Sequence, residues 1–174
     1  RKKWRAIACV NRYNILNNLH EVYDNYDAYI VDIWGVLWDG IEAYDHAKNT
    51  LEKLKEKKKN IVLLSNAPRR SDLVAQRLNS IGINKSHYNT IISSGEVCRE
   101  YFLANNKKLS EIGNSFYFIG QELDKEIALN LRVKETKNIA DSNFLLVCGT
   151  RDFGHTLKDY INDNLILIEA SSNI

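Results

Sequence analysis

Two polar residues, Asp32 and Ser65, stand at the ends of two short apolar runs, and their types suit phosphoryl chemistry. Ala28 to Val31 lead directly into Asp32, and Ile61 to Leu64 lead into Ser65. A carboxylate can attack phosphorus and form an aspartyl-phosphate, and a hydroxyl beside it can hold phosphoryl oxygens. The loop after Ser65 leads to a predicted helix N-terminus, which favours anions. The same two residues could instead cap a loop and end a strand, and spacing alone leaves both interpretations open.

Parallel strands would have to position these side chains. Continuous apolar runs are typical of strands that are buried on both faces of a parallel sheet. Helical spacing follows the first run at Ala43, Ala47, Leu51 and Leu54, and the second at Val74, Leu78 and Ile81. A third strand at 90–92 and another helix after it complete a βαβαβα order, which predicts an α/β fold with a Rossmann-like parallel sheet and right-handed crossovers. The carboxyl ends of neighbouring strands would then face one crevice.

The chain divides into three predicted parts. Residues 1–21 form an N-terminal arm with a short helix, and residues 22–110 form the α/β unit just described. Residues 111–174 predict part of a second α/β unit, with strands at 116–119, 144–148 and 165–168 and helical segments at 122–130 and 156–161.

Two motifs resemble those of a known family. VDIWGVLWDG resembles the first motif of the haloacid dehalogenase (HAD) superfamily, and LLSNAPRR resembles its second. LNSIGI and YNTIISSGE follow in the order and spacing of its class IIA members, the nucleotide monophosphatase and p-nitrophenyl phosphatase type, while YFIG and FLLVCGTRD resemble the start of the α/β cap of that class. The resemblance spans residues 26–174 and implies the front part of a HAD core with a partial class IIA cap. It also implies a magnesium-dependent phosphatase that acts on a small phosphorylated metabolite.

The resemblance implies a role for each matching residue. Asp32 matches the nucleophile, which also binds magnesium, and the backbone carbonyl of Trp34 matches a second magnesium ligand. Ser65, with Asn66 beside it, matches the phosphoryl-binding pair. Gly35 permits the tight loop behind the nucleophile, where a strained turn and a close backbone approach suit a residue without Cβ.

Two departures from the family pattern keep other functions open. Trp34 stands where phosphatases of the superfamily carry a second aspartate as general acid, as in an uncharacterised DxWGV subgroup of class IIA. The family's later lysine and acidic motif have no counterpart before Ile174, so we expect a chain truncated within the cap and inactive alone. One alternative is a degenerate, non-catalytic relative that retains the fold. Another is a metal-free haloacid dehalogenase, against which the cap type argues.

Composition excludes few partners. The 174 residues carry a net charge of +2 and are 44% hydrophobic, which favours a globular protein and gives no argument for nucleic-acid binding. No apolar run is long enough to span a membrane. Three scattered cysteines without a CxxC pair favour a reducing cytoplasm. Arg69 and Arg70, which follow the second strand, are interpreted either as attracting an anionic substrate or as a solvated helix start, and the four histidines as surface or loop residues.

Overall fold

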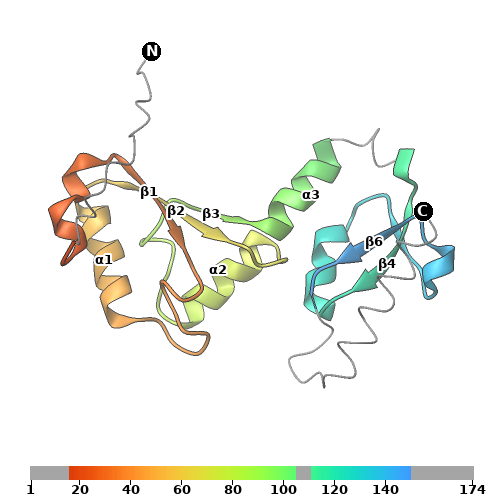
Figure 1. The fold of residues 1–174 in the computed structure, drawn as a ribbon, viewed down its shortest axis with the longest axis horizontal. Helices are drawn as coiled ribbons and strands as arrows, with labels where there is room; N and C mark the ends of the chain where they lie inside the picture. Colours follow the sequence, from red (N-terminus) through yellow and green to blue (C-terminus); the bar gives the residue numbers. More distant parts are fainter. Residues whose placement is uncertain (1–15, 105–110, 150–174) are drawn as a thin grey trace, which may run out of the picture.

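A computed structural model of the chain describes residues 16–104 and 111–149. Its first unit is a three-stranded parallel sheet of order β1-β2-β3, with β1 at Ala28–Asp32, β2 at Asn60–Ser65 and β3 at Thr90–Ser93 (Figure 1). Three helices follow the strands in turn: α1 at Asp45–Glu56, α2 at Ser71–Ser80 and α3 at Ser94–Ala104. Two short 3-10 turns, η1 (Leu19–Glu21) and η2 (Tyr23–Asn25), precede β1. The predicted βαβαβα order is therefore confirmed.

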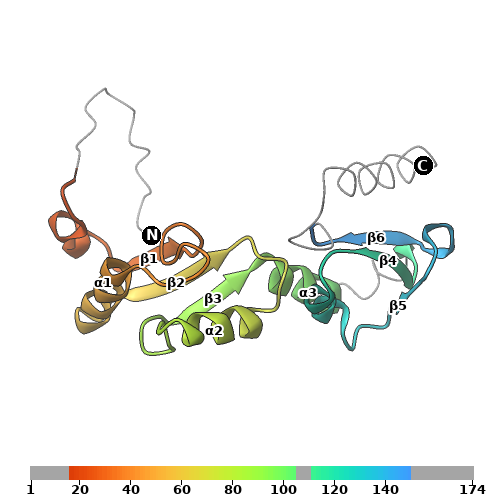
Figure 2. The same ribbon diagram turned by 90° about the horizontal axis from the view of Figure 1, so that it is seen from below.

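Helices α1 and α2 both lie on the same face of this sheet (Figures 1 and 2). The strands are added in sequence order, and two right-handed crossovers that move in one direction place both helices on one side. On that side Ile61 and Leu63 are fully buried, whereas Ile30 on the opposite face is 73% exposed. The expectation of strands buried on both faces is thus wrong within the described residues, where helices cover a single face.

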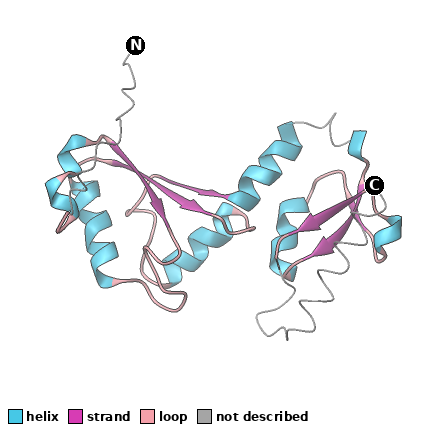
Figure 3. Ribbon diagram, viewed as in Figure 1, coloured by secondary structure: helices cyan, strands magenta, loops and turns pink. Residues whose placement is uncertain are grey.

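The second unit is a smaller parallel sheet of order β5-β4-β6, whose strands are labelled in Figure 2. Figure 3 distinguishes helices, strands and loops by colour. Strand β4 spans Ser115–Ile119, β5 spans Lys134–Glu135 and β6 spans Phe144–Val147. Segment η3 (Glu122–Ala128) follows β4, and the short turn η4 (Ile139–Asp141) precedes β6. The helix expected around 122–130 is therefore a 3-10 segment, and the two-residue strand β5 was not predicted.

Each sheet has a hydrophobic core of its own. Leu51, Leu63 and Leu78 centre the first core, while Phe116, Phe118, Ile127 and Leu146 form the second. In the described ranges no helix is long and apolar enough to cross a membrane. The strand expected at 165–168, the helix expected at 156–161 and most of the N-terminal arm lie outside the described residues.

Candidate active site

Asp32 and Ser65 occupy the carboxyl ends of adjacent parallel strands. Asp32 is the register partner of Leu64, the residue before Ser65, and Ser65 in turn pairs with Ser93 of β3. A cleft of about 960 Å³ is lined by Asp32, Trp34, Ser65 and Asn66, together with side chains of β3 and α3. The placement expected from the strand pattern is therefore observed, while the roles that the resemblance implies stay predictions.

The loop after Asp32 is a tight turn that a backbone hydrogen bond closes. The backbone N–H of Ile33 donates to Oδ1 of Asp32 (2.9 Å), and the N–H of Gly35 donates to the carbonyl of Trp38 (2.8 Å). Gly35 has φ +77°, a left-handed conformation that favours glycine. A Cβ built on Gly35 would meet no atom within 4 Å. The tight turn expected at Gly35 is confirmed. The expectation that other backbone approaches Gly35 closely is wrong for the described residues.

Trp34 is 58% exposed at the mouth of the cleft. Its ring lies edge-on to Trp38, with 5.2 Å between centroids, and against Gly40, where an added Cβ would come within 2.9 Å of the indole. Asp39 belongs to the neighbouring turn, because its Oδ1 accepts the N–H groups of Ile41 and Glu42. The hydrogen bonds from Glu42 and Ile41 lower the pKa of the Asp39 carboxyl. Asp39 is therefore a turn residue.

The segment that follows Ser65 rests on the start of α3. Ser65 Oγ accepts the N–H of Ala67 (3.1 Å), and Ser94 Oγ lies 2.9 Å from the carbonyl of Asn66, to which it donates. Gly95 packs so closely beneath this segment that a Cβ there would lie 2.5 Å from the backbone nitrogen of Arg69. This support was not predicted from the sequence, although the small residues of SSGE directly after the predicted third strand were its signal.

The two arginines of LLSNAPRR are each held by a carboxylate. Arg70 Nε lies 2.8 Å from Glu96 Oε2, which also accepts the N–H of Ser71 at the start of α2. The hydrogen bond from Arg70 lowers the pKa of Glu96, and the same bond raises the pKa of Arg70. Arg69 Nε lies 2.8 Å from Oδ1 of Asp124 in η3. Both arginine side chains are partly buried and form ion pairs, so the interpretation as solvated side chains is wrong, although Arg70 does stand at the start of α2. The attraction of an anionic substrate stays a prediction.

His87 lies in the loop between α2 and β3, as one part of its interpretation states, but it is buried rather than on the surface. It is 4% exposed, and its Nε2 lies 3.3 Å from Oε1 of Glu52 on α1. His87 does not line the cleft.

One carboxylate of the cleft, that of Asp32, has the chemistry of a magnesium ligand. Asp32 presents an exposed carboxylate to the cleft, and magnesium typically takes one or two carboxylates together with substrate phosphate and water. Within residues 16–104 and 111–149, no three His, Cys, Asp or Glu side chains group as a metal site. The Asp32 carboxylate thus fits one ligand position of a magnesium ion, and the ligand role of the Trp34 carbonyl stays a prediction.

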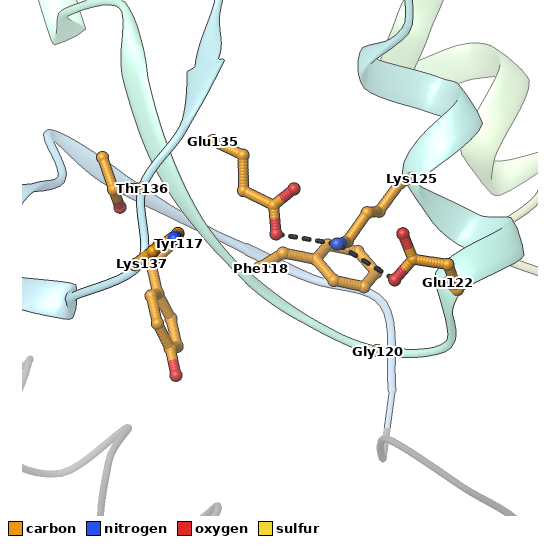
Figure 4. A pocket seen from close by; sticks show the side chains of 8 residues that line it. All are labelled: Tyr117, Phe118, Gly120, Glu122, Lys125, Glu135, Thr136 and Lys137. Atoms are coloured by element: carbon orange, nitrogen blue, oxygen red, sulfur yellow. Dashed lines mark ion pairs between the residues drawn. The ribbon is translucent and has the colours of Figure 1, made fainter.

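A second hollow, of about 630 Å³, lies in the β4 unit (Figure 4). Lys125 extends across it over the ring of Phe118 and is held by Glu122 (3.0 Å) and Glu135 (2.8 Å). The hydrogen bond to Glu135 is the main cause that raises the pKa of Lys125. Because two carboxylates already surround this ammonium group, the hollow offers little attraction to an anion.

Fold and cleft together define an α/β protein with a carboxylate, a hydroxyl and an amide at one strand edge. A family model described as haloacid dehalogenase-like hydrolase matches residues 29–160, and the chain belongs to this family. The assignment made from the motifs is confirmed.

Three similar proteins each match part of this chain over part of their own length. Over 102 residues the chain is 29% identical to Phosphoglycolate phosphatase 2 of Arabidopsis thaliana, covering 56% of this chain and 34% of the relative. A haloacid dehalogenase-like hydrolase from Brucella suis shares the fold with a TM-score of 0.76 and 24% identity, covering 90% of this chain and 57% of that one. A glycerol phosphate phosphatase from Mycobacterium tuberculosis, solved with magnesium, has a TM-score of 0.57 and 15% identity over 84% of this chain and 42% of its own. The matched part of the chain thus spans between 34% and 57% of the length of these proteins.

Proposed function

We propose that the chain is the front part of a magnesium-dependent phosphatase of class IIA that acts in the cytoplasm on a small phosphorylated metabolite. The observation that carries the proposal is the single cleft shared by Asp32, Ser65 and Asn66 at the ends of adjacent strands. The phosphatase named among its relatives and the magnesium in one similar structure support it. The proposed boundaries place the core at 22–110 and the cap from 111 onward.

In the proposed reaction Asp32 attacks phosphorus and forms an aspartyl-phosphate, while the bond from phosphorus to the ester oxygen breaks and the alcohol leaves. Water later hydrolyses the aspartyl-phosphate to free phosphate and restores the Asp32 carboxylate. The N–H of Ile33 donates to Oδ1 of Asp32, and we assign the attack to Oδ2. The hydroxyl of Ser65 and the amide of Asn66 hold the phosphoryl oxygens. Magnesium, bound in part by Asp32 and the Trp34 carbonyl, would offset the negative charge of carboxylate and phosphate. Trp34 has no titratable group that could protonate the leaving oxygen.

The second candidate is a relative that keeps the fold without turnover. Trp34 favours it, because the indole occupies the position that the resemblance gives to the general acid. The same cleft would then bind a phosphorylated compound without hydrolysing it. The two candidates differ only in catalysis, so a turnover assay separates them.

The test uses p-nitrophenyl phosphate and magnesium with two proteins. The 174-residue chain alone should show little or no turnover, because the resemblance places a required lysine and acidic motif after the cap. A protein that joins these residues to those later motifs should turn over, and Asp32→Asn should abolish its activity. Asp39→Asn is the matched control, since Asp39 serves the turn seven positions further on. Activity that survives Asp32→Asn would overturn the aspartyl-phosphate mechanism.

A further inference from the structure

Arg69 connects the two units of the protein. It lies in the segment between β2 and α2, four positions after Ser65, and its guanidinium reaches η3 of the second unit. Nε donates to Oδ1 of Asp124 (2.8 Å), and Nη2 donates to Oε1 of Gln121 (2.5 Å). The Asp124 side chain is 4% exposed, so this carboxylate depends on Arg69 for compensation of its charge.

The backbone of Arg69 is fixed separately from its side chain. Its carbonyl accepts the hydroxyl of Ser93, a fully buried residue, at 2.6 Å. Gly95 leaves no room beneath it, since a Cβ would lie 2.6 Å from the same carbonyl oxygen. The backbone of Arg69 is thus held by β3 and α3, and its side chain is held by η3. Arg69 therefore couples the position of one unit to that of the other.

A second arginine strengthens the same junction at the other end of η3. Arg99 of α3 donates from Nη1 to the carbonyls of Ile127 (3.1 Å) and Leu129. Helix α3 and η3 lie side by side in both ribbon views and pack against each other (Figures 1 and 2). Arg69 therefore forms hydrogen bonds near the start of η3, and Arg99 forms them near its end.

We propose that Arg69 is a positioning residue that sets the placement of the cap unit relative to the phosphate-binding segment 65–70. Any effect of Arg69 on catalysis rests on the proposed phosphatase function. The geometric part concerns two units of this chain and can be measured without any turnover. Its failure would leave the proposed function standing, and loss of that function would leave the coupling intact.

The neighbouring Arg70 provides a matched control. Arg69 and Arg70 are adjacent, and each forms an ion pair with 2.8 Å between Nε and a carboxylate oxygen. The partner of Arg70 is Glu96, which belongs to the same unit, whereas the partner of Arg69 belongs to the other unit. Arg69→Gln removes an ion pair and the bond to Gln121, both of which cross between the units, whereas Arg70→Gln removes an ion pair within one unit.

The experiment is amide hydrogen exchange on the whole chain, followed by mass spectrometry of peptides from η3, from 65–70 and from β2. Arg69→Gln should speed exchange in η3 on the order of tenfold or more, as expected for loss of a hydrogen bond to a charged group, with β2 unchanged. Arg70→Gln should leave η3 at the wild-type rate. Arg69→Lys should give a smaller increase, because the ammonium group keeps the charge and loses the fork that also reaches Gln121.

A rescue variant separates coupling from general weakening. Asp124→Asn placed on Arg69→Gln removes the buried charge that the first change leaves uncompensated, and should return part of the protection of η3. Should Arg69→Gln also speed exchange in β2, the milder Arg69→Lys decides in its place. Equal exchange of η3 in the Arg69 and Arg70 variants, or strictly additive effects of Arg69→Gln and Asp124→Asn, would overturn the proposal.

Discussion

Replacement of Trp34 by aspartate tests the position of the missing general acid, and its cost in stability follows from the structure. Trp34 is 58% exposed, so folding removes roughly 100 Å² of a tryptophan surface of about 250 Å² from water. At about 25 cal/mol per Å² this burial stabilises by about 2.5 kcal/mol as an upper bound. We expect Trp34→Asp to cost about 2–3 kcal/mol, including the edge contact with Trp38, which is at or below the 3–5 kcal/mol typical of a buried tryptophan.

This cost can be measured on the chain itself. For a protein of this size about 2–3 kcal/mol lowers the Tm by about 4–12 °C. Trp34→Phe is the control, because it keeps an aromatic ring beside Trp38 and should lie closer to wild type. A drop in Tm well beyond this range would show that the indole is buried by parts of the protein outside the described residues.

The catalytic effect requires a protein that joins these residues to the later lysine and acidic motif. General acid catalysis contributes about 10²–10⁴-fold, and alkyl phosphates depend on it far more than aryl phosphates, whose leaving oxygens are weakly basic. Trp34→Asp should therefore raise the ratio of alkyl to aryl kcat/KM, by up to that factor. Trp34→Asn is the control, because asparagine has nearly the same shape as aspartate but no carboxyl group. This variant should leave the ratio of alkyl to aryl kcat/KM unchanged. An unchanged ratio in folded Trp34→Asp protein with saturating magnesium would refute the assignment of residue 34 to the general-acid position.

Two further predictions concern stability. Ile61→Ala, at a fully buried position, should lower the free energy of unfolding in denaturant titrations by about 2–5 kcal/mol. Ile30→Ala, at a position 73% exposed, should lower it by less than about 1 kcal/mol. Similar losses in the two variants would show that the face of the sheet that carries Ile30 is covered. The lowered pKa of Glu96, caused mainly by Arg70, contributes stability that is present above the unfolded value of about 4.3 and is lost as the pH falls through the folded pKa. Glu96→Gln should therefore flatten the acid limb of a plot of Tm against pH, and an unaltered limb would contradict the role of this ion pair.

The sequence was sufficient for the features that depend on local pattern. Apolar runs placed β1, β2 and β3, and polar residues at their ends placed Asp32 and Ser65 at one cleft. These features follow from chain chemistry at short range, because the period of a strand and the handedness of a crossover need no distant partner. Gly35 was predicted correctly for its turn on the same ground.

The features that sequence analysis missed depend on contacts between distant segments. Arg69 and Asp124 are 55 positions apart, and no local pattern indicates that one compensates the other. The close approach expected at Gly35 occurs instead at Gly95, where the neighbouring backbone comes from a different loop. The β5 pairing with β4 is likewise too short to leave a periodic signal.

The distribution of these contacts bears on how a substrate would be selected at the cleft. Asp32 and Ser65 lie at the ends of strands that pack on the first hydrophobic core, so in the proposed function the sheet would set the position of the phosphoryl group. Trp34, by contrast, lies on an exposed turn, and segment 65–70 is tied through Arg69 to the other unit. Recognition of phosphate and recognition of the remainder of the molecule would thus rest on different parts of the chain. A substitution in the second unit can then alter which ester is accepted while Asp32 and Ser65 stay in place.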